Sequence, residues 1–151
     1  MNNFLITPAT DAERIWAAEL MATTEPWTTL GITLAQSLVA CQEEGNLVYI
    51  ARGDQKPVGV IILQNKGVAG SPYIKSIAVA SGFRNQGAGK LLLTFAEDKY
   101  RTISKHLFLS VSSFNKQAQE FYKANGYRAV GEFENYIVDG HSEILMHKKL
   151  H

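Results

Sequence analysis

Apolar positions along the chain follow two spacings, one typical of strands and one typical of helices. Short runs rich in β-branched and aromatic residues predict strands. These runs are Phe4–Ile6, Leu47–Ala51, Val58–Leu63, Ile77–Val79, Leu107–Val111, Tyr127–Tyr136 and Ser142–Lys149. Between them, apolar residues recur at helical spacing in four segments, which begin at Thr10, Thr33, Gly87 and Asn115. The order β α α β β β α β α β β predicts a single mixed α/β domain over residues 1–151.

Local signals place the ends of the helices. Thr10 with Glu13, and Thr33 with Gln36, form the pattern of a capping box, in which each residue bonds the other's backbone N–H group. The first helix is then predicted to bury a face made by Ile15, Trp16, Leu20 and Met21. The last helix is predicted to end before Gly126, because glycine readily adopts the left-handed conformation that follows a helix.

Three connections between strands carry turn signals. Residues 53–56 are predicted to form a hairpin between two strands. Residues 65–71 are predicted to form a glycine-rich loop. Asp139–Gly140 suits a type I′ turn, so we expect it to join the last two strands.

Composition narrows the functional classes. Of the 151 residues, 46% are hydrophobic and 19% charged, as in ordinary globular domains. The net charge of +1 lacks the basic character expected of a nucleic-acid-binding protein. Cys41 is the only cysteine and falls in an apolar helical pattern, so we expect it in the core. The histidines show no metal-ligand spacing, so no metal is expected. With no signal-peptide pattern and no apolar run of about 18 residues, we expect a cytoplasmic protein without a membrane partner.

The segment Arg84–Lys90 has the chemistry of an anion site. It follows a β-branched run and opens a helix at Gly87, with a second glycine at Gly89. Glycines at the start of a helix let backbone N–H groups approach an anion, and the helix dipole adds its positive end. Arg84 and Lys90 flank the turn with positive charge.

Two well-known phosphate-binding motifs do not fit this segment. A P-loop requires a lysine and then a hydroxyl residue after its second glycine, but Ala88 follows Gly87, and Leu91 follows Lys90. A dinucleotide-binding fingerprint requires a third glycine, but Leu92 stands at that position. What remains is the pattern R-x-x-G-x-G after a strand.

Two motifs resemble those of the GNAT superfamily of N-acetyltransferases. The R-x-x-G-x-G loop resembles the acetyl-CoA signature of that superfamily, and Asn115–Tyr127 resembles its N-x-x-A-x-x-x-Y-x-x-x-G-[FY] helix. Glu134–Tyr136 and Gly140–Met146 resemble, more loosely, the ending of ribosomal-protein N-terminal alanine acetyltransferases. The resemblance implies the GNAT fold, an α/β (α+β) architecture with a mixed central sheet of about seven strands and four helices. It also implies that the sheet splays between its fourth and fifth strands.

The resemblance implies a binding site for acetyl-CoA. The loop would hold the pyrophosphate, and the strand Ile77–Val79 would pair with the pantetheine arm, with the N–H of Val79 polarising the thioester carbonyl. Asn115 would bond the pantetheine or support that strand, and it also suits a helix N-cap. The implied acetyl-CoA residues are Ile77, Ala78, Val79, Arg84, Asn85, Gln86, Gly87, Ala88, Gly89, Lys90 and Asn115.

Tyr122 matches the tyrosine that the family uses as general acid for the leaving thiolate. A phenol titrates near pH ~10 and a thiol near ~8.5, so return of the proton is only modestly uphill. An alternative is that Tyr122 packs the helix onto the sheet. No general base can be carried over, because the two positions that hold a glutamate in family members are Ser110 and Lys75 here.

Four residues are candidates for the acceptor side, namely Glu25, Trp27, Glu134 and Tyr136. Each has a plainer alternative. The two carboxylates also suit a solvated surface, Trp27 also suits a plug that closes the core, and Tyr136 also suits the end of a strand.

These features predict an enzyme, an acetyl-CoA-dependent N-acetyltransferase that acts on a primary amine by direct attack in a ternary complex. The amine belongs to a protein N-terminus or to a small molecule. The alternative is a CoA-binding regulatory or interaction module that has lost transfer, which the missing glutamate supports and Tyr122 opposes. Family members are often dimers, so a homodimer is a further expectation.

Overall fold

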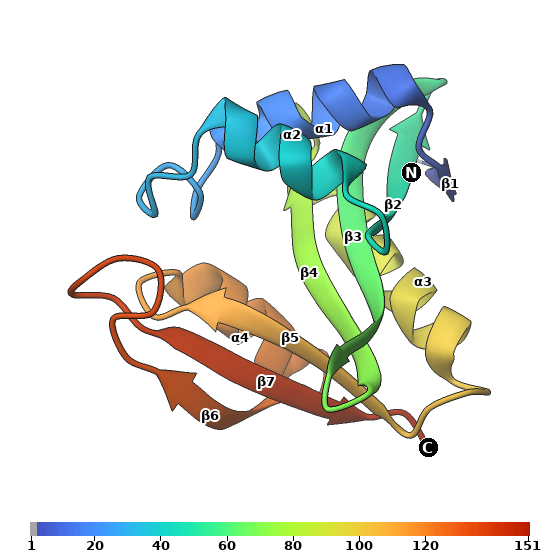
Figure 1. Ribbon diagram of the computed structural model, residues 1–151. Helices are drawn as coiled ribbons and strands as arrows, with labels where there is room; N and C mark the ends of the chain where they lie inside the picture. The colour runs from blue at the N-terminus through green and yellow to red at the C-terminus, as the bar shows by residue number, and fades with distance from the viewer. Residues whose placement is uncertain (1–2) are drawn as a thin grey trace.

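A computed structural model describes residues 3–151, and a mixed sheet of seven strands forms its centre (Figure 1). The strands are β1 (Leu5–Pro8), β2 (Leu47–Gly53), β3 (Lys56–Val68), β4 (Ser71–Val79), β5 (His106–Ser112), β6 (Arg128–Phe133) and β7 (Glu143–Lys149). They lie in the order β1-β2-β3-β4-β5-β7-β6. The α-helices are α1 (Asp11–Ala22), α2 (Leu34–Gln42), α3 (Ala88–Tyr100) and α4 (Lys116–Ala124). In the described part of the chain, the predicted order of elements is confirmed.

The helices lie on both faces of the sheet. Figure 1 shows α1 and α2 on one face, and α3 and α4 on the other. Two apolar clusters fill the layers, and each fully buried aliphatic side chain in them contributes about 1.5–3 kcal/mol. The cluster under α1 and α2 includes Met21 and Cys41, so the core position predicted for the cysteine is confirmed. The cluster under α3 and α4 includes Leu92 and Tyr122.

The first helix confirms its predicted cap but not the whole of its predicted buried face. Both halves of the capping box are present, with Thr10 and Glu13 bonding each other's backbone N–H groups. The residues packed fully against the sheet are Ala17, Ala18 and Met21, whereas Ile15 is 44% exposed. At 3.6 residues per turn, Ala17, Ala18 and Met21 share one face, and Ile15 lies outside it, toward solvent. Its predicted burial is therefore wrong.

Two predicted connections are also wrong. Residues 65–71 form a tight hairpin, in which β3 continues to Val68 and β4 begins at Ser71. Ala69 and Gly70 form the turn with φ of 49° and 80°, the twist that a two-residue hairpin requires. Between β6 and β7 the chain instead makes a longer loop over residues 134–142. Of the Asp139–Gly140 pair only Gly140 has a positive φ, so no type I′ turn forms there.

The sheet splits between β4 and β5, as predicted. These two strands run parallel and pair only at Tyr73–Phe108 and Ile74–Leu109. Immediately afterwards Lys75 is left without a partner on β3, because Ile62 faces Ser76 while Leu63 faces Ile74. This bulge bends β4, and bulges commonly end pairing next to functional sites. Beyond it β4 stays with β3, and β5 stays with β7 along its whole length.

Candidate functional site

A cleft of about 650 Å³ lies where β4 and β5 separate. Its walls come from both faces of the sheet, because the α1–α2 segment lines one side and α4 lines another. β4, β5 and β7 supply the strand residues of the lining, and the β6–β7 loop supplies more. The split therefore makes a passage through the sheet rather than a surface groove.

The predicted anion loop leads into α3 with its backbone donors uncovered. Gly87 is the N-cap residue with φ of 89°, and no side chain caps the helix. The first N–H groups of a helix have no acceptor within it, so those of Ala88, Gly89 and Lys90 are open to an external anion. A Cβ at Gly87 would meet nothing within 4 Å, so glycine is required there for its backbone conformation and not for space.

The end of β4 presents a free backbone edge toward the split. Val79 and its neighbours pair with β3 on one side and have no partner on β5. Ala80 N–H donates to Val58 O at 2.8 Å, so by the alternation along a strand the Val79 N–H points to the open edge. Arg84 Nε donates to Val79 O at 3.2 Å from that same edge, which ties the loop to the strand.

Tyr122 is fixed on α4 and lines the cleft. The helix ends in a Schellman motif, in which Tyr127 N–H donates to Tyr122 O at 3.0 Å and Gly126 N–H donates to Lys123 O at 3.1 Å. The rings of Tyr122 and Tyr127 pack edge to face at 6.1 Å. Tyr122 is 6% exposed, and this burial, with a smaller contribution from Tyr73, raises the pKa of its phenol. At neutral pH it therefore holds its proton.

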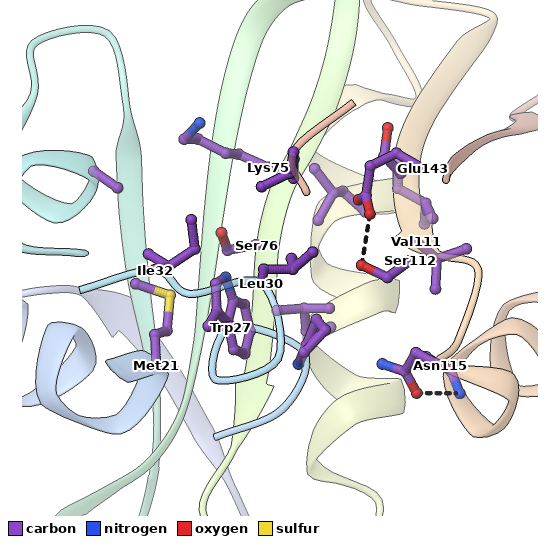
Figure 2. Close-up of a pocket in the computed structure, with 18 of the residues that line it drawn as sticks. Met21, Trp27, Leu30, Ile32, Lys75, Ser76, Val111, Ser112, Asn115 and Glu143 are labelled. Atoms are coloured by element: carbon purple, nitrogen blue, oxygen red, sulfur yellow. Dashed lines mark hydrogen bonds between the residues drawn. The ribbon is translucent and has the colours of Figure 1, made fainter. Parts of the chain in front are cut away.

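Asn115 lines the cleft, and so do Ser110 and Lys75, the two positions that hold a glutamate in family members. Asn115 caps α4, its Oδ1 accepting the Ala118 N–H at 3.2 Å, and it lines the cleft at the same time. Ser110 hydrogen-bonds Tyr73, whose pKa is raised chiefly by burial and lowered in part by that bond. Lys75 lies on the bulge of β4, exposed and pointing away from Glu143 (Figure 2).

Glu143 is the site residue that sequence reasoning missed. It begins β7, lines the cleft and is only 9% exposed. Ser112 Oγ donates to its Oε2 at 2.6 Å, as the dashed line in Figure 2 shows. Burial raises the pKa of this carboxyl, against the lowering effect of the Ser112 bond. Its only sequence signal is its place within Gly140–Met146, the stretch that resembles a family ending.

The four acceptor-side candidates differ in whether they line the cleft and in how exposed they are. Trp27 lines the cleft and also packs on the core cluster under α1 and α2, a position that fits either of its alternatives. Tyr136 lines the cleft and is 68% exposed. Glu25 lies at the rim, where its carboxylate accepts bonds from the hydroxyls of Thr28 and Thr29, and these bonds lower its pKa. Glu134 is exposed and is not among the residues that line the cleft.

The family is decided by comparison with known protein domains. The model of the acetyltransferase (GNAT) family matches residues 12–127. The chain belongs to this family. The matched region runs from α1 to Tyr127, three residues beyond the end of α4, so it includes the glycine loop, the open edge of β4 and Tyr122. The predicted class, an acetyltransferase, is confirmed at this level.

Solved structures show the same fold along nearly the whole chain. A protein from Desulfovibrio desulfuricans assigned to the GNAT family as an acetyltransferase is 17% identical, with a TM-score of 0.84 over 99% of this chain and 100% of its own. The ribosomal-protein-S18-alanine N-acetyltransferase of Escherichia coli is 21% identical, with a TM-score of 0.78 over 98% of this chain and 94% of its own. A GNAT family acetyltransferase from Elizabethkingia anophelis, solved with acetyl-CoA bound, is 21% identical, with a TM-score of 0.73 over 97% of this chain and 98% of its own. At these identities the likeness shows a shared fold. A search of curated proteins found no relative.

Two other features of the described residues bear on function. Within residues 3–151, no three or more His, Cys, Asp or Glu side chains gather as they would around a metal ion. No helix in the same range is both long and apolar enough to cross a bilayer.

Proposed function

We propose that this acetyltransferase moves the acetyl group of acetyl-CoA to a primary amine, by direct attack of the amine within a ternary complex. The observation that carries the proposal is the split between β4 and β5, with the donor loop beyond the end of β4 and Tyr122 in the cleft. The uncapped N-terminus of α3, the open edge of β4 and Tyr122 are the three features that acetyl-CoA would contact in turn.

The donor would be held by backbone groups. The pyrophosphate of acetyl-CoA would take the N–H groups of residues 85–90, with Arg84 and Lys90 at the rim, because a helix N-terminus favours negative charge. The pantetheine arm would add to the open edge of β4 beside Ile77 and Ala78, in the manner of an extra strand. In this placement the N–H of Val79 faces the arm and can polarise the thioester carbonyl.

The reaction needs one proton for the leaving group. The amine nitrogen attacks the carbonyl carbon, a C–N bond forms, and the C–S bond breaks as the tetrahedral intermediate collapses. Tyr122 gives its phenolic proton to the departing thiolate and regains one from the nitrogen of the intermediate. Because burial keeps the phenol protonated, the acid is present in the form that the step requires.

The test is release of CoA thiol from acetyl-CoA across a panel of amines, with mass spectrometry of the products. The panel contains peptide N-terminal amines, lysine side chains, amino acids, alkylamines and arylalkylamines. We expect thiol release proportional to enzyme with at least one of them, together with the acetylated amine. Tight binding of acetyl-CoA without turnover of any amine would leave a CoA-binding module and overturn the proposal.

A further inference from the structure

We propose that Glu143, held in place by Ser112, receives the acceptor as an ammonium ion and takes its proton before attack. This assigns the general base that the family positions at Ser110 and Lys75 do not supply. It rests on the proposed transfer to an amine.

The carboxylate is held rigidly at the junction of β5, β7 and α4. Ser112 Oγ donates to Glu143 Oε2 at 2.6 Å, and Ser112 itself is 1% exposed. Gln119 Nε2, from α4, donates to the carbonyl oxygens of Ser112 at 3.1 Å and Ser113 at 3.0 Å. Ser113 and Ser142 then close the ends of the two strands, with Ser113 N–H donating to Ser142 O at 2.9 Å. This network fixes one oxygen of the carboxylate and leaves the other for a ligand.

The second oxygen of Glu143, Oε1, accepts no hydrogen bond from residues 3–151, although its residue lines the cleft. Oε1 is not a buried atom, so it is accessible from the cleft although most of the Glu143 side chain is buried. A largely desolvated carboxylate with one accessible oxygen attracts a hydrogen-bonding cation. Figure 2 shows Glu143 and Ser112 across the cleft from Trp27 and Leu30, with the ammonium of Lys75 pointing away from them. Residues 3–151 offer Glu143 no ion-pair partner, and a bound ammonium group would supply one.

None of the other titratable groups considered around the cleft is suited to accept the proton of the amine, which leaves Glu143 as the base. Tyr73 on β4 lies near it, and Tyr136 on the β6–β7 loop and Tyr122 on α4 line the same cleft. Tyrosines are neutral at physiological pH and cannot take a proton there. Glu25 is the other carboxylate of the lining, and its oxygens are occupied by Thr28 and Thr29. Burial also raises the pKa of Glu143, which strengthens it as a base.

The proton steps balance. The acceptor R–NH3⁺ passes one proton to Glu143, which leaves R–NH2 and a neutral carboxylic acid. The amine then attacks the thioester, and Tyr122 protonates the thiolate and is restored by the second nitrogen proton. Glu143 finally gives its proton to water, so the net products are R–NH–acetyl, CoA thiol and one proton.

The experiment compares the wild type with Glu143→Gln, using an amine from the panel that the wild type acetylates. General-base catalysis contributes about 10²–10⁴-fold, so we expect kcat/KM for the amine to fall by that factor while the acetyl-CoA Kd stays within about twofold. The pH profile should also change shape. The acid limb of the wild type should follow Glu143, whereas the residual activity of Glu143→Gln should rise until the amine itself loses its proton. Ser112→Ala, which keeps the carboxylate but loosens it, should show an intermediate loss.

Stability gives a readout that does not depend on activity. The folded state raises the pKa of Glu143 above its unfolded value, so the folded state binds the proton more tightly. The free energy of unfolding therefore falls as pH rises from the ordinary carboxyl range through the raised pKa. Glu143→Gln removes that loss, so it should melt above the wild type at about pH 8, and the gap should close at about pH 4. Glu132→Gln on exposed β6 is the matched control and should change neither melting nor rate.

Two results would overturn the assignment. One is a kcat/KM for Glu143→Gln within threefold of the wild type, roughly 0.6 kcal/mol of barrier. The other is a Glu143→Gln protein that melts below the wild type at about pH 8, which would make the carboxylate a structural partner of Ser112. Both are distinct from failure of the proposed function, in which the wild type itself acetylates no amine.

Discussion

Replacing Tyr122 by phenylalanine separates its chemical role from its packing role. The substitution keeps the ring that packs at 5.4 Å from Phe121 and 6.1 Å from Tyr127 and removes only the hydroxyl. That hydroxyl donates to no acceptor in the part of the chain that the structure describes, so its loss leaves no protein group unsatisfied. We therefore expect no loss of stability from Tyr122→Phe, and a large loss of rate.

The expected magnitude follows from general-acid catalysis. A positioned acid contributes about 10²–10⁴-fold, which corresponds to about 2.7–5.4 kcal/mol of barrier. The loss should appear in kcat, with the acetyl-CoA Kd unchanged, because the donor is held elsewhere along the loop and β4. The assay is steady-state thiol release at saturating acetyl-CoA, with calorimetric titration for the Kd.

Tyr127→Phe is the matched control, five residues along the chain. Its hydroxyl donates to Glu97 Oε2 at 3.0 Å, and Lys148 Nζ donates to the other oxygen of that carboxylate at 3.0 Å. A hydrogen bond to a charged group contributes about 1.5–3 kcal/mol. Tyr127→Phe should therefore lower the melting temperature by roughly 3–12 °C while leaving kcat unchanged. The two variants should thus show opposite patterns of stability and rate.

Equal kcat values for Tyr122→Phe and the wild type would refute the reasoning and leave Tyr122 as a packing residue. A Tyr122→Phe protein that loses both stability and acetyl-CoA affinity would also contradict it, because the hydroxyl would then have a structural partner.

Two further predictions concern the donor loop and the core. Gly87→Ala places a side chain at φ 89°, which is disfavoured by about 1–2 kcal/mol. We therefore expect the free energy of unfolding and the binding free energy of acetyl-CoA to weaken by about that much in total. Gly45→Ala, at φ 91° and equally without neighbours within 4 Å, should lose stability alone; equal Kd values for the two variants would argue against backbone binding at Gly87. Burial raises the pKa of Cys41 to about 11, so iodoacetamide should leave it unlabelled in the folded protein at about pH 8 and label it on unfolding, as mass spectrometry can measure. Labelling at the same rate in both states would contradict the core position.

Features set by neighbours in the sequence could be predicted well. Each capping box needs only two residues three positions apart, and both were found as expected at Thr10 and Thr33. The cap at Gly87 and the end of α4 before Gly126 depend on one glycine each, so they too were readable from the sequence. The family motifs lie on these local elements, which is why the donor side was easier to predict than the acceptor side.

Features set by contacts between residues far apart in the sequence could not be predicted. The hairpin at Ala69–Gly70 forms because β3 and β4 continue to pair beyond Leu63. In this stretch the strands are so close that a Cβ at Gly67 would lie 2.4 Å from the Cβ of Tyr73. The glycines there looked like a loop but mark a close crossing of two strands. Glu143 became visible only through the β5–β7 register, which sets it opposite Ser112. Nothing local in the sequence indicates that this carboxylate is buried beside a cleft.

The most direct test of the central claim is a crystal structure of the protein with acetyl-CoA. We expect the pyrophosphate at the N–H groups of residues 85–90, the pantetheine paired along β4 between Ile77 and Val79, and the sulfur within hydrogen-bonding reach of the Tyr122 hydroxyl. Acetyl-CoA bound away from the split between β4 and β5, or with its sulfur remote from Tyr122, would contradict the account.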